Sequence, residues 1–174
     1  NMGKMLTGED IVAIDHKSIE GLSERLVNSI GDIEDTFSCI ISGESGNGKT
    51  SMTLDILKEL VDKVGDVLYL GLEEGHGKSF KAGLIRSGID LKKIKVYDDL
   101  DFDGLNKVLD RRSSPKIVVI DSVQYMNLTY IQYKQLKRKY LFGKKINARK
   151  ILIMISHSRG KTIDGKSAFS IRHD

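Results

Sequence analysis

Hydrophobic and polar positions form two kinds of segment that alternate along this chain. Stretches whose apolar residues recur every three or four positions indicate amphipathic helices. Between them lie short, almost wholly apolar runs, which are typical of strands buried on both faces of a parallel sheet. These runs occupy residues 37–41, 67–72, 94–97, 116–120 and 150–155. The alternation therefore predicts a three-layer α/β fold, with a mainly parallel sheet covered by helices on both faces.

Polar and glycine residues give the expected limits of the helices. We expect Ser18 to cap a helix that ends at Gly31, and Asp103 to cap a later one. Other helices are expected directly after Thr50 and up to about residue 64, around residues 80–86 before Gly88, and, with a basic character, over about 131–142. Residues 1–36 would form an N-terminal lead with one packing helix, and residues 37–174 would form the core domain.

Composition places the chain among folded globular proteins. Its 174 residues are 40% hydrophobic and 30% charged, which argues against disorder and fibrous repeats. The apolar runs are far shorter than the roughly 18 residues of a membrane span. Cys39 is the single cysteine, so a disulfide framework or a multi-cysteine zinc site is excluded. We therefore expect a cytoplasmic protein with no membrane partner.

Charge is divided unevenly between the two parts of the chain. Residues 1–110 carry 13 Lys and Arg against 21 Asp and Glu, a net charge of −8, whereas residues 111–174 carry 15 against 3, a net charge of +12. A basic segment of this size is typical of proteins with polyanionic partners. It could equally face bound phosphates or a neighbouring subunit.

The sequence GESGNGKT at residues 43–50 matches the phosphate-loop pattern in full. It lies between a predicted strand and a predicted helix, so backbone N–H groups at the helix start can point at a phosphate chain. We expect Lys49 to reach the β- and γ-phosphates and Thr50 to ligate Mg²⁺. The nucleotide-binding residues predicted here are Gly43, Glu44, Ser45, Gly46, Asn47, Gly48, Lys49, Thr50 and Ser51.

Three further residues follow predicted strands and could complete the chemistry. Asp121 is the acid at the end of an apolar strand, where phosphate-loop proteins present a second Mg²⁺ anchor. Glu73 follows another strand and could polarise a water molecule, or it could be a solvated loop acid. His157 could sense the γ-phosphate, or it could be an ordinary surface histidine. Residues 72–79 imitate a second phosphate loop, but Leu72 replaces the first glycine and two carboxylates would face the phosphates.

Taken together, these features resemble the RecA-like ATPase core. They are the loop at 43–50, the strand that leads to Glu73, and the strand ends at Asp121 and His157. The nearest branches are the RadA-type and DnaB-type proteins and related phage or mobile-element ATPases. The resemblance covers residues 37–174. It implies that Glu73 activates water, that Lys49 and His157 are catalytic, and that ATP and Mg²⁺ are bound. It also implies DNA binding, in recombination, repair or helicase-type motors or loaders, and a homo-oligomeric ring or filament. The chain lacks a RadA-type lysine-asparagine-arginine signature and ends at Asp174, where the resemblance implies further strands.

Basic residues are the candidates for contacts with single- or double-stranded DNA, or for a finger that completes a neighbour's site. These are Arg159, Lys161 and Lys166, in the loop that the resemblance places toward DNA or a neighbouring subunit, and Lys137 and Arg138 in the basic helix. Tyrosines at 125, 130, 133 and 140 lie among the cations and could stack on bases, or pack inward instead. Two other functions stay open: a nucleotide-gated switch with little turnover, and, less favoured, a small-molecule kinase.

Overall fold

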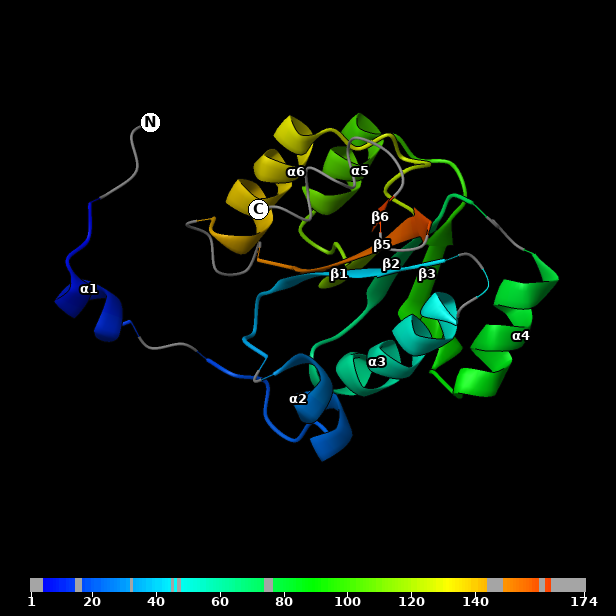
Figure 1. Ribbon diagram of the computed structural model, residues 1–174, viewed down its shortest axis with the longest axis horizontal. Coiled ribbons are helices and arrows are strands. Elements are labelled where there is room, and N and C mark those ends of the chain that lie inside the picture. The colour runs from blue at the N-terminus through cyan, green and yellow to red at the C-terminus, as the bar shows by residue number, and fades with distance from the viewer. Residues whose placement is uncertain are drawn as a thin grey trace.

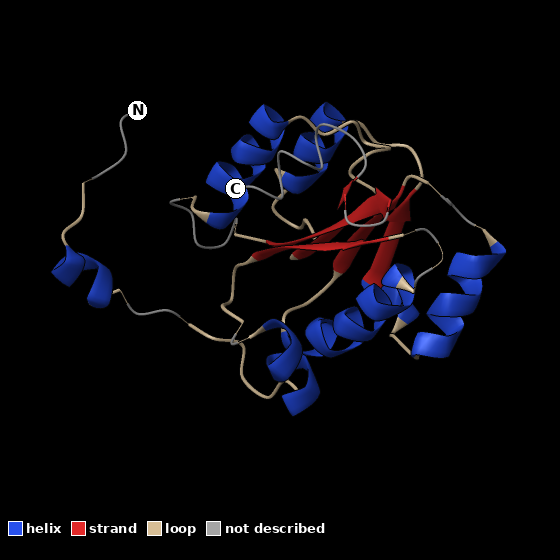
Figure 2. Cartoon of the chain, in the orientation of Figure 1, coloured by secondary structure: helices blue, strands red, loops and turns tan. Residues whose placement is uncertain are grey.

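The computed structural model describes residues 5–14, 17–31, 33–44, 46, 48–73, 77–143, 149–159 and 162–163. Within these residues, one six-stranded sheet forms the centre of the molecule (Figures 1 and 2). Five strands are parallel, and a short sixth strand pairs antiparallel with β5. The order across the sheet is β1 (Ser38–Gly43), β5 (Ile151–Arg159), β4 (Ile117–Asp121), β2 (Val67–Gly71) and β3 (Ile94–Tyr97), with β6 (Thr162–Ile163) beside β5.

Helices cover both faces of the sheet, so the expected three-layer α/β architecture is confirmed (Figure 1). One face carries α2 (Glu24–Ile30), α3 (Lys49–Lys63) and α4 (Lys78–Ser87). The other carries α5 (Phe102–Leu109) and α6 (Tyr130–Leu136), which continues into a π-helical turn (Lys137–Leu141). A 3₁₀ turn (Leu91–Lys93) precedes β3, and α1 (Gly8–Val12) buries no residue and stands apart from the sheet.

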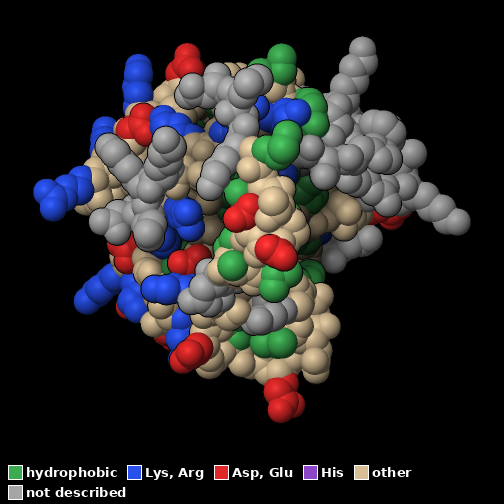
Figure 3. Space-filling model, turned by 90° about the vertical axis from the view of Figure 1, so that its left-hand side faces the viewer, with side chains coloured by type: hydrophobic (Ala, Val, Ile, Leu, Met, Phe, Trp, Pro, Cys, Tyr) green, Lys and Arg blue, Asp and Glu red, His purple; other side chains and the backbone are tan. Residues whose placement is uncertain are grey.

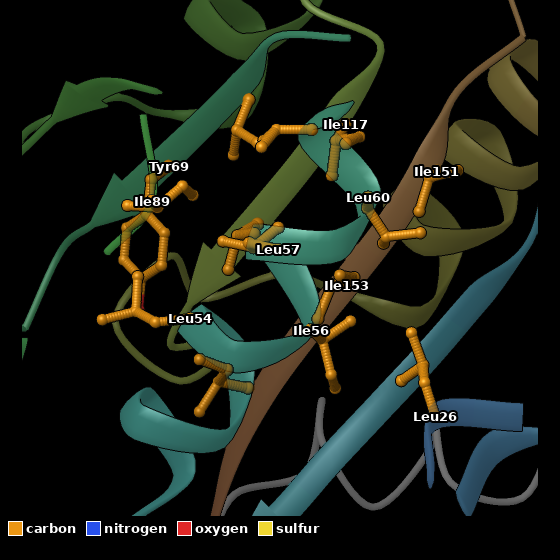
Figure 4. Packing of buried hydrophobic residues seen from close by; sticks show 14 of the residues in the cluster. Leu26, Leu54, Ile56, Leu57, Leu60, Tyr69, Ile89, Ile117, Ile151 and Ile153 are labelled. Atoms are coloured by element: carbon orange, nitrogen blue, oxygen red, sulfur yellow. The ribbon is translucent and has the colours of Figure 1, made fainter. Parts of the chain in front are cut away.

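The core consists of two hydrophobic clusters, one on each face of the sheet. Alternate residues of β4 belong to opposite clusters: Ile117 and Val119 face α3, whereas Val118 and Ile120 face α5 and α6. All four are at most 1% exposed, as expected for a strand buried on both faces. Figure 4 shows the α3 side, where leucines of α3 pack against isoleucines of β4 and β5: Leu54, Leu57, Leu60, Ile117, Ile151 and Ile153.

Two expected helix caps are wrong. Ser18 forms an isolated bridge with Glu34, and the cap of α2 is Ser23, five residues later, which accepts from the N–H of Leu26. Gly21 lies between them with φ of 74°, a conformation that interrupts a right-handed helix. Likewise Asp101, not Asp103, caps α5 by accepting from the N–H of Gly104. In both cases two polar residues stood near the helix start, and Ser23 has in addition a long-range contact, in which its N–H and hydroxyl donate to the Glu59 carboxylate at 2.8 and 2.7 Å.

The ends of the helices follow the sequence prediction more closely. Gly31 and Gly88 terminate α2 and α4 with φ of 82° and 66°, values that glycine adopts at little cost. The predicted basic helix is present as α6 and the π-helical turn. Every helix in the described part of the chain is too short or too polar to cross a bilayer.

Candidate functional site

A pocket at the carboxyl ends of the strands gathers residues that are far apart in the sequence. Helix α3 contributes Lys49, Thr50 and Ser51, β4 contributes Asp121, and β5 contributes His157. The remaining lining residues follow β2 or belong to the glycine loop and α4: Glu73, Gly46, Gly48 and Ser79. In parallel α/β sheets this edge is where ligands bind. The folded chain therefore brings the predicted loop, acids and histidine into one hollow.

The glycine loop has the backbone shape that the sequence pattern requires. Gly46 and Gly48 have φ of 82° and 76°, in the left-handed region that favours glycine. The Lys49 ammonium turns back into this loop and donates to the carbonyl oxygens of Gly43 at 3.0 Å and Glu44 at 2.8 Å. Lys49 is only 9% exposed, so these bonds compensate for its burial. Ser45 and Asn47, which are also predicted to bind the nucleotide, lie outside the described residues.

Asp121 is fixed at the end of β4 by its neighbour β2. The register pairs Gly71 with Asp121, and the hydroxyl of the fully buried Tyr69 donates to Oδ2 of Asp121 at 2.6 Å. The Asp121–Ser122 peptide bond is cis. The Asp121 carboxylate thus has a defined orientation at the pocket, set by a buried hydroxyl on the adjacent strand.

Glu73 and His157 contact each other although 84 residues separate them. Nε2 of His157 is within hydrogen-bonding distance of Oε2 of Glu73. Both side chains are partly exposed, 18% for His157 and 26% for Glu73. Between β2 and β5 lies β4, so the two side chains meet over the carboxyl end of the central strand. A carboxylate and an imidazole in contact at a pocket can move a proton or orient a water molecule.

The oxygen donors in the pocket suit a magnesium ion. Mg²⁺ prefers oxygen ligands and keeps several waters, so one or two protein ligands with substrate phosphates are sufficient. The Thr50 hydroxyl and the Asp121 carboxylate supply such oxygens in the same pocket. In the described segments, no group of three or more His, Cys, Asp and Glu residues could hold a metal ion by itself.

Three supporting residues were missed by the sequence analysis. Tyr69 binds Asp121, Gln124 binds Ser156 and His157, and Arg86 of α4 donates to Oγ of Ser51 at 2.9 Å. Each acts across a separation of 32 to 52 residues. Tyrosine on an apolar strand and arginine on an amphipathic helix are ordinary there, so no local signal marks them.

The basic candidates lie away from the pocket, or outside the described residues. Lys137 lies over the Tyr133 ring at 5.2 Å, and Arg138 is exposed in the π-helical turn. Arg159 belongs to β5, but its side chain is outside the described part, as are Lys161 and Lys166 altogether. None of the described cations except Lys49 lines the pocket.

The tyrosines of the basic helix are mostly turned inward. Tyr133 is 5% exposed and Tyr140 is 1% exposed, so base stacking on these two rings is excluded. The Tyr140 hydroxyl instead contacts Asn106 and Asp110 of the α5 region at 3.1 Å each. Tyr125 is 61% exposed and keeps an accessible ring. Of the two alternatives that the sequence leaves open, inward packing therefore holds for Tyr133 and Tyr140.

Comparison with known proteins supports the architecture. No protein-family model matches the chain. A solved KaiC-like protein from the hyperthermophilic archaeon Pyrococcus horikoshii OT3 superposes with a TM-score of 0.58 over 91% of this chain and 77% of that one, at 17% sequence identity. The fold is RecA-like. Since the identity is low, this likeness concerns the fold.

A weak similarity in sequence points to the same group of proteins. Over 85 residues, or 49% of its length, the chain is 29% identical to the DNA repair protein RadA of Bacillus subtilis strain 168. The matched segment spans 18% of that protein, so the chain corresponds to a small part of its relative. Together the two similarities support a RecA-like phosphate-loop core.

Proposed function

We propose that this protein binds and hydrolyses ATP with Mg²⁺, and that it couples this reaction to work on DNA. The observation that carries the proposal is the convergence of Lys49, Thr50, Asp121, Glu73 and His157 in one pocket. Each side chain has the chemistry that phosphoryl transfer to water requires, and the residues come from separate elements that the sheet topology places together.

The phosphate loop would bind the triphosphate. Residues 49–51 at the start of α3 line the pocket, and the unpaired N–H groups and dipole of a helix N-terminus favour negative charge. Lys49 would leave the carbonyls of Gly43 and Glu44 to meet the β- and γ-phosphate oxygens. Thr50 and Asp121 would hold Mg²⁺, which when bound neutralises charge on the phosphate oxygens.

Glu73 would act on the attacking water. The water oxygen forms a bond to the γ-phosphorus as the bond to the bridging oxygen breaks, and ADP leaves. The proton of the water passes to the Glu73 carboxylate. His157 contacts one oxygen of this carboxylate, so it would orient the other oxygen toward the water. The products are ADP and inorganic phosphate.

The proposed role on DNA is supported by the relative's name and by surface charge. The matched relative is a DNA repair protein, and the basic part of the chain includes the exposed Lys134 and Arg138. Figure 3, which views the molecule from the side of α1, shows most of the visible Lys and Arg side chains on its left-hand side, with Asp and Glu side chains among them. We infer recombination, repair or helicase-type work, performed as a homo-oligomer.

ATP turnover measured with Mg²⁺, with and without single-stranded DNA, tests the proposal. We expect hydrolysis that requires Mg²⁺ and is stimulated by DNA at low salt, with less stimulation as salt rises. Hydrolysis without stimulation by DNA would contradict the DNA role alone. Binding of ATP without turnover in either condition would contradict the hydrolase and favour a nucleotide-gated switch.

A further inference from the structure

Gln124 occupies an unusual position next to the strand that carries His157. It lies three residues after Asp121, in the connection from β4 to α6, and its side chain is partly buried. The side-chain nitrogen Nε2 donates to Oγ of Ser156 at 2.9 Å and to the carbonyl oxygen of His157 at 3.2 Å. Its oxygen Oε1 accepts from the backbone N–H of His157 at 3.3 Å. One side chain therefore engages both backbone polar groups of His157.

These bonds continue the sheet beyond the point where β4 leaves it. The last registered pair between β4 and β5 is Asp121 with Ile155, and Val123 adds a bond from its N–H to the Ile155 carbonyl at 3.0 Å. Past that pair, β5 has no β4 residue beside His157. The Gln124 amide provides one donor and one acceptor there, as a strand backbone would.

The other side of His157 is occupied by the phosphate-loop strand. In the register of β1 with β5, Gly43 pairs with His157. His157 thus lies between the first glycine of the loop and the Gln124 amide, while its imidazole meets Glu73. The bonds on both sides fix the position of the His157 backbone, and with it the point from which the imidazole reaches the Glu73 carboxylate.

We propose that Gln124 is a positioning residue, which holds the backbone of His157 so that the imidazole is kept against Glu73. This inference rests on the proposed hydrolytic function of the site. Gln124 itself does not line the pocket, so it acts through His157. Its loss would change the rate of the chemical step more than the binding of the nucleotide, because the phosphate loop would remain intact.

Kinetics of Gln124→Leu test this role, with Gln135→Leu as the matched control, since Gln135 is an exposed residue of α6 outside the pocket. We expect kcat to fall about 10- to 100-fold in Gln124→Leu, with KM for ATP within about twofold of wild type. Gln135→Leu should keep the wild-type values. In a His157→Ala background, Gln124→Leu should change kcat by less than about twofold, because its effect passes through His157. Equal effects in both backgrounds would overturn the proposal.

A measurement that needs no turnover separates this inference from the proposed function. The chain has four histidines, and His157→Ala identifies the imidazole NMR signal of His157 by its loss. We expect this signal to shift in Gln124→Leu and to stay unchanged in Gln135→Leu. If wild type does not hydrolyse ATP, the hydrolase proposal fails, and the signal alone decides the role of Gln124. An unchanged signal in Gln124→Leu would overturn that role.

A second substitution covers the case in which Gln124→Leu does not fold. Gln124→Glu keeps the side-chain length and an acceptor for the His157 N–H, but it removes the donor to the His157 carbonyl. We expect a shift of the His157 signal and a reduced kcat, with KM for ATP retained. Wild-type behaviour on both measurements would show that the Gln124 donor has no role in positioning His157.

Discussion

The hydroxyl of Tyr69 donates a 2.6 Å hydrogen bond to Oδ2 of Asp121, from one strand to the next. Tyr69 is fully buried, and its ring lies against Phe80 of α4 with 4.7 Å between ring centroids. The orientation of the proposed Mg²⁺ anchor is therefore tied to the packing of α4 on β2. The carboxylate is held from inside the core, not only by what binds in the pocket.

Replacing Tyr69 by Phe should weaken Mg²⁺ binding while keeping the fold. The ring would still pack on Phe80, but Asp121 would lose the donor that orients its carboxylate. Because such outer partners typically contribute 10- to 100-fold to metal affinity or activity, we expect about a tenfold higher Mg²⁺ concentration at half-maximal turnover. A Mg²⁺ titration of ATPase activity measures this. An unchanged midpoint would show that Tyr69 has a packing role only.

Replacing Glu73 by Gln should separate binding from hydrolysis. The amide keeps the size of the side chain but cannot accept the proton of the attacking water. We expect turnover to fall about 10²- to 10⁴-fold, with the Kd for ATP changed by no more than a few-fold. Single-turnover kinetics and a binding titration measure the two effects. Glu20→Gln, which changes an exposed carboxylate of the N-terminal segment, should behave as wild type. Retained turnover in Glu73→Gln would remove Glu73 from the mechanism.

Lys150 should make the stability depend on pH in the alkaline range. It is 2% exposed, its ammonium donates to Oγ of Ser114 at 2.6 Å, and burial together with the nearby charge of Lys116 lowers its pKa to about 8. Between this pKa and the ordinary value of 10.5, the unfolded chain holds a proton that the folded chain has lost. The free energy of unfolding should therefore rise with pH there, by up to about 1.4 kcal/mol per pH unit from this residue.

Denaturant unfolding of wild type and Lys150→Met at pH 7, 8.5 and 10 isolates this contribution. Other groups titrate in the same range, but they do so in both proteins. The difference in stability between the two proteins should change in favour of wild type as the pH rises. A difference that is independent of pH would contradict the lowered pKa of Lys150.

The exposed cations of the basic helix should contribute to DNA affinity. Replacing Lys134 and Arg138 by Gln removes two charges from the outer side of α6 and the π-helical turn. If both contact phosphates, the slope of log affinity against log salt should become shallower by about 1.4 for single-stranded DNA. Lys58→Gln with Lys81→Gln removes two exposed charges from the other face of the sheet and should leave the slope unchanged. Equal slopes for wild type and both double variants would show that Lys134 and Arg138 face solvent and do not contact DNA phosphates.

The sequence was most informative at positions whose conformation or burial only a few residue types can satisfy. Glycines at 46 and 48 and the apolar strands could be located in advance, because φ above zero and burial on both faces each restrict the choice of residue. The contact between Glu73 and His157 depends on the order of the strands in the sheet, which the sequence alone does not give. Tyr69 and Gln124 could not be foreseen, since their roles depend on the register of strands 30 or more residues away. The caps at Ser23 and Asp101 were missed because Ser18 and Asp103 offered the same local chemistry.

The hydrogen bonds from the Lys49 ammonium to two carbonyl oxygens of its own loop influence which ligands the loop can bind. The ammonium was dehydrated when the chain folded, so an arriving nucleotide exchanges one set of oxygen ligands for another instead of capturing a hydrated cation. This exchange lowers the free energy only if the ligand oxygens carry more negative charge than the two neutral carbonyls that they replace. The loop carbonyls of Gly43 and Glu44 thus compete with a ligand for the Lys49 ammonium, which favours a polyphosphate over a neutral metabolite.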